Sequence, residues 1–400
     1  MNRPWPTYTK GFVNLGDEEV EAAQKTIQSK RLFRYDDRPY SETENGKLEF
    51  EISEFFGVKH VLTVSSGTAA LTLSLLSLDL KPNDKVGCSS FTFTATPSAI
   101  IQANLSPILL ECDTDLNMDL TDLRAKIKDL KAIVVVHMRG YASPIKEIIK
   151  VANEYRIPVI EDAVPAMGLT IDDKYLGTYG DVGAFSSQSD KSINSGEGGF
   201  VVTNNTELFS KMVAYSGAYE TAYASHFSTT DLPINFNPLS VPLFNFRMDE
   251  IRASICRVQF GKLSERVGKL KVNYDNLLKE MECIDAPISI RQASYKNGNL
   301  GDSIQICFNE PPKALLASEL LRDRGIDCSY FGDTKKVNAR CFWNWKYLFP
   351  GMNIHEIKEM LPKAFHNISK YIDIQLSPLL TDEEIEYLAY SLKEVCYEIK

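Results

Sequence analysis

From about residue 60, short apolar runs alternate with segments in which apolar residues recur every three or four positions. Runs that are nearly continuous in apolar residues are typical of strands covered on both faces of a parallel sheet. Helical spacing is clearest at residues 68–78 and 143–156. This order predicts an α/β fold with a mostly parallel sheet flanked by helices. The predicted strands occupy residues 60–66, 85–91, 106–113, 131–138 and 157–163.

The clear alternation ends after the Gly-rich segment SGEGGFVVTN. Residues 216–245 are irregular and rich in Tyr, Ser, Thr, Asn and Pro, which indicates a long functional loop. A helix is predicted at about 248–280, and mixed strands and helices follow it, including ISIRQ, SIQICFN, KALLASELLRDRG and the tail from Asp382. We therefore expect a large domain over residues 1–260 and a smaller C-terminal α+β domain over residues 261–400.

Composition and charge narrow the function. The 400 residues carry a net charge of −9 without a long run of one sign, which disfavours nucleic acid or an anionic membrane as a partner, because both attract clustered Lys and Arg. The eight cysteines form no CxxC pair, so neither a metal site nor a disulfide framework is indicated. The sequence shows no signal peptide and no membrane span. We expect a cytoplasmic protein that acts on small molecules.

Small residues follow the first predicted strand. In VSSGTAAL, Ser65, Ser66, Gly67 and Thr68 stand between this strand and a helix. Free backbone N–H groups at the start of a helix can hold a phosphate group. Taken alone, the segment fits an ordinary glycine turn with Thr68 as the helix cap better than a phosphate site.

Two carboxylates, Glu161 and Asp162, end the otherwise apolar strand at 157–163. Adjacent side chains on a strand point to opposite faces, so only one of the two can face a crevice at the sheet edge. A buried carboxylate needs a cationic or hydrogen-bonding partner, and a protonated pyridine nitrogen would be one for Asp162. A surface strand end with Asp162 as a helix cap fits this segment equally well.

One lysine, Lys191, lies between a Ser-rich strand end and a Gly-rich turn in GAFSSQSDKSINSGEGG. Most lysines are simply solvated. A lysine held in a pocket beside other cationic groups can lose its proton and attack a carbonyl carbon. The neighbouring hydroxyls and glycines favour a pocket of this kind, since glycine allows the backbone to approach a ligand closely.

Aromatic residues follow the second predicted strand in SSFTFTAT. Strand alternation indicates that one of Phe91 and Phe93 reaches the crevice, where it can stack on a flat ring. Packing in the core is the more usual role of Phe, and it is the expected role of the other residue.

Taken together and in this order, the segments resemble the DegT/DnrJ/EryC1/StrS family of sugar aminotransferases. The resemblance extends from about Gly16 to Gln259. It implies the pyridoxal-phosphate-dependent transferase fold type I, which is the fold of aspartate aminotransferase. The segments that carry it are LGDEEV, SGTAAL, FTFTAT, VVHMRG, EDAVPAMG, YLGTYGDVGAFSSQSDK with GEGG, and FNFRMDEIRAS.

The resemblance also assigns roles to single residues. It implies that Lys191 forms the Schiff base with pyridoxal phosphate and that Asp162 pairs with the pyridine nitrogen of the cofactor. Thr68 and Ala69 match the turn that holds the phosphate, Ser186 is a further phosphate ligand, and Phe93 stacks on the ring. Asn245, in the N-F-R-M segment, is expected to reach the cofactor phosphate of the neighbouring subunit, which implies a homodimer with shared active sites.

Two positions depart from the pattern of this family. Pro165 stands three residues after Asp162, where Gln or His is usual, and it offers no side-chain hydrogen bond. Asp190 precedes Lys191, where small or neutral residues are usual. The segments LFRY, VHMRG and GIDCSYFG with FWNW also resemble a branch that includes the transaminase making 8-amino-3,8-dideoxy-octulosonate.

The implied chemistry has two half-reactions. Lys191 holds pyridoxal phosphate as an aldimine, an amino-acid donor such as L-glutamate or L-glutamine converts the cofactor to pyridoxamine phosphate, and a keto sugar then accepts the amino group. The sugar is nucleotide-linked or free. A dehydratase of the same family is an alternative, but it has histidine in place of the lysine. A cysteine desulfurase and a non-catalytic, cofactor-binding regulator are further alternatives. We expect substrate contacts from residues 216–245, from Arg31 to Tyr40 and from the region near Trp343.

Overall fold

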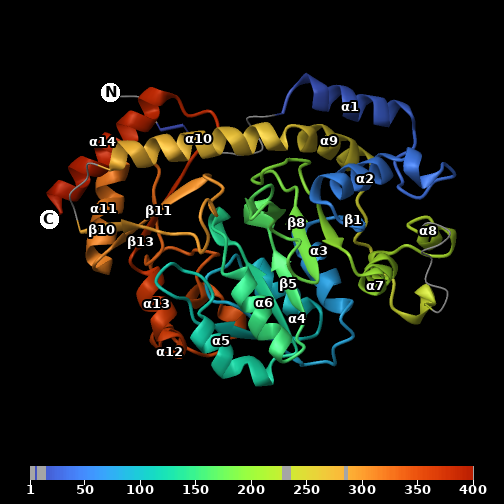
Figure 1. The fold of residues 1–400 in the computed structure, drawn as a ribbon, viewed down its shortest axis with the longest axis horizontal. Coiled ribbons are helices and arrows are strands. Elements are labelled where there is room, and N and C mark those ends of the chain that lie inside the picture. Colours follow the sequence, from blue (N-terminus) through green and yellow to red (C-terminus); the bar gives the residue numbers. More distant parts are fainter. Residues whose placement is uncertain (1–4, 7–14, 228–235, 283–286, 400) are drawn as a thin grey trace.

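Two β-sheets and the helices around them make up the molecule. The computed structural model describes residues 5–6, 15–227, 236–282 and 287–399. A seven-stranded sheet lies in the larger part of the molecule and a four-stranded sheet lies beside it, while the helices α9 (Glu250–Gly261) and α10 (Leu263–Met281) run one after the other along one side of both (Figure 1).

The larger sheet has the strand order β1-β9-β8-β5-β4-β2-β3. Its neighbouring strands are parallel from β8 to β3, whereas β9 runs antiparallel to both β8 and β1. All five strands predicted from the apolar runs are confirmed. The strands are β1 (His60–Val64), β2 (Lys85–Ser89), β3 (Ser106–Leu110), β4 (Ala132–Val136), β5 (Val159–Asp162), β8 (Val182–Ser186) and β9 (Gly199–Thr203).

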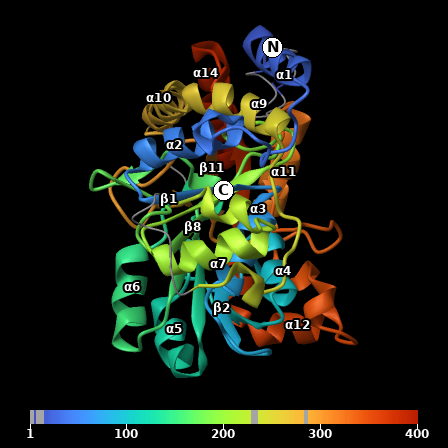
Figure 2. The same cartoon turned by 90° about the vertical axis from the view of Figure 1, so that its right-hand side faces the viewer.

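Helices cover both faces of this sheet. Along β4, Ala132 and Val134 pack with the apolar residues of α3 (Gly67–Leu76), α4 (Ala95–Gln102) and α7 (Thr206–Ser216). Ile133 and Val135 point to the opposite face and pack with α5 (Leu120–Lys126) and α6 (Ile145–Glu154). Figure 2 shows the two layers on either side of the sheet. Burial on both faces explains why these strands read as continuous apolar runs.

The smaller sheet is antiparallel, with the order β10-β11-β13-β12. Helices α10, α11 and α14 share its apolar core, and this helix-covered sheet agrees with the predicted α+β character of the C-terminal part. The division between residues 260 and 261 stays a prediction. The elements are β10 (Ile288–Ile290), β11 (Ser303–Phe308), α11 (Pro311–Asp323), β12 (Ser329–Tyr330), α12 (Ile354–Met360), α13 (Pro362–Ile368), β13 (Tyr371–Gln375) and α14 (Asp382–Glu398).

Some elements differ from the sequence-based expectation. The helix expected at 248–280 is divided into α9 and α10, with Lys262 capping both. The stretch at 216–245 is mostly irregular, as expected, but contains the short helix α8 (Thr221–Ala224), and its residues 228–235 lie outside the described part of the chain. Helices α1 (Asp17–Gln28) and α2 (Glu44–Phe56) and the hairpin of β6 (Thr170–Ile171) and β7 (Lys174–Tyr175) were not predicted.

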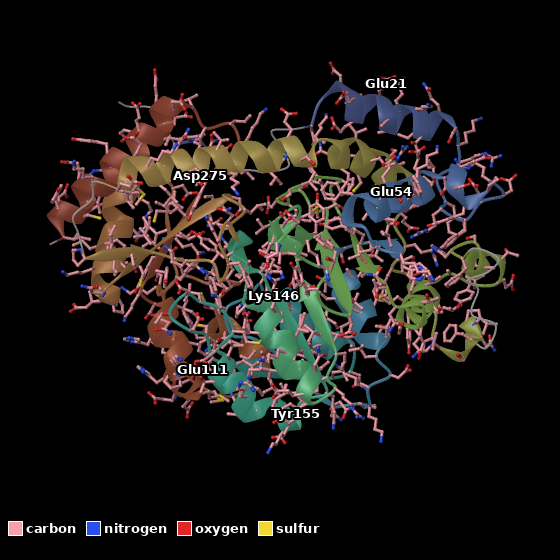
Figure 3. All side chains as sticks on the ribbon, viewed as in Figure 1. Glu21, Glu54, Glu111, Lys146, Tyr155 and Asp275 are labelled. Carbon is pink, nitrogen blue, oxygen red and sulfur yellow. The ribbon has the colours of Figure 1, made fainter. Side chains whose placement is uncertain are left out.

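Charged side chains lie on the outer surfaces of this architecture. Figure 3 shows Glu21 on α1, Glu54 on α2 and Asp275 on α10 along the upper side of the molecule. All three are exposed. Within the described ranges, no helix combines the length and the apolar character needed to cross a membrane.

Candidate active site

A cavity of about 450 Å³ opens where the central strands of the larger sheet end. Ligand crevices in α/β proteins lie outside the carboxyl ends of the strands, and this volume is typical of small-molecule sites. Ala69 and Asn245 are predicted site residues that do not line the cavity. The other predicted site residues do line it, namely Gly67, Thr68, Phe93, Asp162, Ser186 and Lys191.

One end of the cavity is formed by the start of α3. The N-cap of this helix is Ser66, whose side chain accepts a hydrogen bond from the backbone N–H of Ala69 at 3.0 Å. Thr68 is therefore not the cap, and the ordinary role considered for it is wrong. The N–H groups of Gly67 and Thr68 have no acceptor among the described residues, so they are the two that can hold an anion.

Gly67 also brings α3 close to β8. A Cβ atom at this position would lie 2.8 Å from Cβ and 3.2 Å from Oγ of Ser186. Only glycine therefore lets the helix start approach Ser186, whose side chain lines the same end of the cavity. The structure thus brings Ser186 of β8 close to the helix start that carries Thr68, while the third predicted phosphate residue, Ala69, lies outside the lining.

Asp162 ends β5 and is 5% exposed. Thr96 donates a hydrogen bond to its Oδ2 at 2.9 Å, and the backbone N–H of Val164 donates to Oδ1 at 3.4 Å. Burial raises the pKa of Asp162, although these hydrogen bonds and the charge of Lys191 oppose the shift. A cation that reached Oδ1 would relieve this cost of burial.

Glu161 points to the opposite face, as strand alternation predicts. Its carboxylate accepts hydrogen bonds from the backbone N–H groups of Gly177, Tyr179 and Gly180 and lies 3.0 Å from His137 Nε2. These partners satisfy a side chain that is fully buried. Glu161 therefore fixes the loop before β8, while Asp162 is left to face the cavity.

Lys191 lies in the loop between β8 and β9. Backbone hydrogen bonds from Ser187 to Gly198 and from Ser189 to Gly196 tie the two sides of this loop together, and the N–H of Lys191 donates to Gln188. Burial lowers the pKa of Lys191, and the charge of Arg340 lowers it further, against the opposing charges of Asp162 and Asp190. A lysine with a lowered pKa is a better nucleophile at neutral pH.

One of the two aromatic residues after β2 reaches the cavity, as expected, but strand alternation is not the reason. Alternation would put residues two positions apart on the same face, and both residues follow the end of β2 at Ser89. Phe91 is 1% exposed and packs against Phe331 in a buried cluster. Phe93 is 46% exposed and lines the cavity, with its ring centroid 5.8 Å from Nζ of Lys191. Phe93 is therefore available to stack on a flat ligand, whereas Phe91 belongs to the core.

Sequence reasoning missed several residues around the cavity. Thr96 positions Asp162, and its place in the segment FTFTAT was the one available signal. Arg139 and Arg340 line the cavity, but they come from segments that are far apart in the sequence. No local pattern predicts such long-range neighbours. Trp343 itself is fully buried in the core, so in that region the residue that borders the cavity is Arg340.

Both departures from the family pattern border the cavity. Pro165 and Asp190 are part of its lining. No described residue from 216–245 or from Arg31 to Tyr40 lines it, so their predicted contacts with a substrate stay predictions. Asn245 is exposed, and its neighbour Phe246 accepts a hydrogen bond from the backbone N–H of Ser65 at 2.8 Å.

The cysteines in the described part of the chain offer no reactive thiol near this cavity. Cys283 lies outside the described residues, and none of the other seven lines the cavity. Burial raises the pKa of several thiols, among them Cys88 and Cys256, each to about 12. Such thiols are poor nucleophiles, which disfavours the desulfurase alternative. Within the described ranges, no group of three His, Cys, Asp or Glu side chains is arranged to hold a metal ion.

Comparison with known proteins gives relatives that are named for nucleotide-linked sugars, one of them as an aminotransferase. A GDP-perosamine synthase of Vibrio cholerae is 32% identical over 226 residues, which are 56% of this chain and 58% of that protein. A UDP-N-acetyl-3-dehydro-alpha-D-glucosamine 3-aminotransferase of Acidithiobacillus ferrooxidans is 26% identical over 88% of each chain. The chain spans just under three fifths of the length of the GDP-perosamine synthase that it matches.

The fold itself has close structural counterparts. The aminotransferase PseC of Helicobacter pylori superimposes with a TM-score of 0.80 over 99% of this chain and 100% of that one, at 20% identity. This likeness confirms the predicted transferase fold type I. A family model matches residues 14–393, which is nearly the whole chain. The chain therefore belongs to the DegT/DnrJ/EryC1/StrS aminotransferase family.

Proposed function

We propose that this chain is a pyridoxal-phosphate-dependent aminotransferase that moves an amino group from an amino-acid donor to a keto sugar. One observation carries the proposal. A buried aspartate with a raised pKa and a lysine with a lowered pKa line the same cavity, one at the end of β5 and the other in the loop after β8. Pairs of titrating groups whose surroundings shift them in opposite directions are typical of catalytic sites.

The cavity fits pyridoxal phosphate group by group. The phosphate needs free N–H donors, and Gly67 and Thr68 offer them at the start of α3 beside the hydroxyl of Ser186. The protonated pyridine nitrogen needs a buried anion, which Asp162 supplies. The aldehyde needs a neutral amine, which is the form that burial favours for Lys191.

Once bound, pyridoxal phosphate supplies an electron sink for the carbon from which a proton is removed. Asp162 would keep a proton on the pyridine nitrogen, and Thr96 holds the carboxylate of Asp162 in place through its hydrogen bond. Lys191 would anchor the cofactor through its amine, and the same amine would carry a proton to and from the reacting carbon. Phe93 lines the cavity and would stack on the ring of the bound cofactor.

The substrates follow from the family and from the relatives. L-glutamate or L-glutamine is the proposed donor. The two relatives compared above are named for nucleotide-linked sugars, and a nucleotide-linked or free keto sugar is the proposed acceptor. A sugar of the 3-deoxy-octulosonate type belongs to this set because of the segments LFRY, VHMRG and FWNW.

A homodimer completes the proposed site. Asn245 is exposed and outside the cavity of its own chain, as a residue that serves a neighbouring subunit must be. It follows residues that are held in place, because the backbone N–H of Phe244 donates to Tyr215. A cytoplasmic location stays a prediction.

Chemical labelling tests the lysine assignment directly. The protein is loaded with pyridoxal phosphate, reduced with borohydride and digested, and the labelled peptide is identified by mass spectrometry. We expect the label on Lys191 and no label in Lys191→Ala. The matched control Lys150→Ala removes an exposed lysine on α6 and should be labelled like the wild type. A label on any other lysine would overturn the assignment.

Amino transfer tests the activity. Addition of L-glutamate or L-glutamine should convert the bound cofactor and release the matching oxo acid, and Lys191→Ala should abolish this while circular dichroism shows a retained fold. Labelling at Lys191 without conversion by any amino donor favours the regulatory binding protein. Loss of water from a deoxy sugar without net amino transfer favours the dehydratase.

A further inference from the structure

The cavity holds three cationic side chains, and they differ in their partners. Lys191 has the role proposed above. Arg139 and Arg340 also line the cavity, and the mechanism uses neither of them. What each arginine contacts therefore decides whether it is part of the framework or is available to a ligand.

Arg139 is part of the framework. Its Nε lies 3.1 Å from Oδ1 of Asp373 and its Nη2 lies 2.6 Å from Oδ2, which is a two-pronged ion pair with β13. Asp373 also accepts a hydrogen bond from Gln305 on β11. Such a pair neutralises both charges and joins the larger sheet region to the smaller sheet.

Arg340 has no such partner. Within the described residues, its guanidinium group makes no ion pair within 4.0 Å and no side-chain hydrogen bond, whereas its backbone N–H donates to Asn338. Burial lowers the pKa of Arg340, and the charge of Arg139 lowers it further, against the opposing charges of Asp373 and Asp190. A partly buried guanidinium without a paired anion is costly, and an incoming anion would offset that cost.

The segment that carries Arg340 is held firmly against the cavity wall. The carbonyl of Ala339 accepts hydrogen bonds from the backbone N–H of Thr94 and from Nε1 of Trp345. Cys341 pairs with Phe91 in a β-bridge. Arg340 is thus presented from a fixed backbone on the β2 side of the cavity, so little conformational freedom is lost when it binds.

The position of Arg340 separates it from the proposed phosphate site. The phosphate turn follows β1, whereas the segment of Arg340 is tied to residues that follow β2. Four strands, β9, β8, β5 and β4, lie between β1 and β2 in the sheet. The loop that carries Lys191 follows β8, and Asp162 ends β5. The two anion-binding features therefore flank the proposed reaction centre.

We propose that Arg340 binds the carboxylate group of a substrate in this cavity. The proposal rests on the function proposed above and deepens it. A planar guanidinium matches a carboxylate through two parallel N–H donors. A pyrophosphate group would need several cations. Of the two arginines in the described lining, Arg139 is paired with Asp373 and Arg340 is the one without an anionic partner. The carboxylate belongs either to the amino-acid donor or to an acidic sugar acceptor.

Titration with a non-reactive dicarboxylate tests the proposal. Succinate has no amino group to transfer, and succinamide is its neutral analogue. Calorimetric titration of the protein loaded with pyridoxal phosphate should show binding of succinate and none of succinamide. Arg340→Gln should raise the Kd for succinate roughly 10- to 100-fold, the usual effect of losing a charged hydrogen bond. Arg340→Lys keeps the charge without the fork and should lie in between.

Controls separate this proposal from the previous one. Arg124→Gln removes an exposed arginine on α5 and should leave the Kd unchanged. Arg340→Gln should still be labelled at Lys191 after borohydride reduction. The succinate titration is repeated on cofactor-free protein, so a failure to bind cofactor leaves the carboxylate test readable. An unchanged Kd for succinate in a folded Arg340→Gln would overturn the proposal, as would an Arg340-dependent preference for GDP over succinate.

Two further arms identify the source of the carboxylate. If it belongs to the donor, Arg340→Gln raises the half-saturating concentration of L-glutamate in the first half-reaction. If it belongs to the acceptor, L-glutamate is unaffected and the Kd of 3-deoxy-octulosonate rises instead. Either result supports carboxylate binding by Arg340. No change in both arms would contradict it.

Discussion

Burial acts in opposite directions on the two residues at the centre of the proposed chemistry. It raises the pKa of Asp162 and lowers the pKa of Lys191, because in both cases the charged form loses its hydration. The neighbouring charges then shift the pKa of Lys191 further. Arg340 repels the ammonium form, whereas Asp190 attracts it. Asp190, which departs from the family pattern, therefore raises the pKa of the lysine that follows it.

Removal of the Asp190 charge and removal of the Arg340 charge should shift the pKa of Lys191 in opposite directions. Only the neutral amine captures a carbonyl, so the rate at which Lys191 captures pyridoxal phosphate rises with pH through the pKa of the lysine. Asp190→Asn should lower this pKa and move the rate profile to lower pH. Arg340→Gln should raise it and move the profile to higher pH. Stopped-flow absorbance over a range of pH values measures both profiles.

The contrast between the two variants is its own control. Both lose one charge and keep a polar side chain, so a general loosening of the loop would move the two profiles in the same direction. Shifts of the same sign would contradict the electrostatic account. The shift for Asp190→Asn should be the smaller one, since this carboxylate is exposed and solvent screens its charge.

The residues of the site differ in how far sequence could identify them. Lys191 and Asp162 stand in local patterns that suggested their roles, and the structure places both in the cavity. Arg340 lies about 150 positions from Lys191 in the printed sequence, and only the fold brings the two charges together. Ala69 matched the phosphate turn, yet its N–H is already bound by Ser66. A sequence motif therefore predicts where a residue lies but not which hydrogen-bond partner it has.

At the scale of elements, the approach of α3 to β8 depends on one glycine. Gly67→Ala would place a methyl group 2.8 Å from Cβ of Ser186, so the helix start must move away from the strand. Overpacking of this kind costs about 1–3 kcal/mol. We expect the affinity for pyridoxal phosphate to fall by roughly tenfold or more, because Gly67, Thr68 and Ser186 no longer converge on the phosphate. Fluorescence titration with the cofactor measures it.

Gly268→Ala is the matched control. This glycine lies on the exposed side of α10, and a Cβ there would meet nothing within 4 Å. Alanine is the better helix former by about 1 kcal/mol, so this variant should unfold at the same or a higher temperature and bind the cofactor normally. Equal cofactor affinity in Gly67→Ala and Gly268→Ala would show that the close approach is not needed.

The elements themselves were predictable where burial imposed a pattern. Strand β4 is covered on both faces and reads as a continuous apolar run, which its packing explains. The break between α9 and α10 was missed, because apolar spacing continues across Lys262 and the break is a matter of backbone angles at one residue. Helix α1 was missed as well, since its buried positions are the polar Glu19 and Thr26 and it packs on α9 instead of on the core.

For the whole molecule, several exposed apolar side chains lie on elements away from the smaller sheet. Val20 and Ile27 on α1, Phe50 on α2, and Leu243 and Phe244 beside Asn245 are all at least 39% exposed. In Figure 1, α1 and α2 lie at the end of the molecule opposite to α14 and the C-terminus. Exposed apolar groups of this size favour contact with another protein surface, which is where a second subunit would receive Asn245.

A mixing experiment tests whether the site is shared between subunits. Lys191→Ala lacks the lysine, and Asn245→Ala lacks the residue proposed to reach the partner's phosphate site, so each homodimer alone should be nearly inactive. In a mixed dimer, the Asn245→Ala subunit keeps its own lysine and receives Asn245 from the Lys191→Ala subunit, which restores one complete site. Random pairing of equal amounts makes about half of the dimers mixed, and each mixed dimer has one complete site out of two. The mixture should therefore reach about one quarter of wild-type activity.

The alternative arrangement gives a different result from the same mixture. If Asn245 serves the cavity of its own chain, each mixed dimer contains one site without the lysine and one without the asparagine, and mixing restores nothing. Co-expression of the two variants with different affinity tags allows the mixed dimer to be purified, and its turnover should then be about half of the wild type because one of its two sites is complete. Activity that stays at the level of the separate variants would place Asn245 in its own subunit or outside the site.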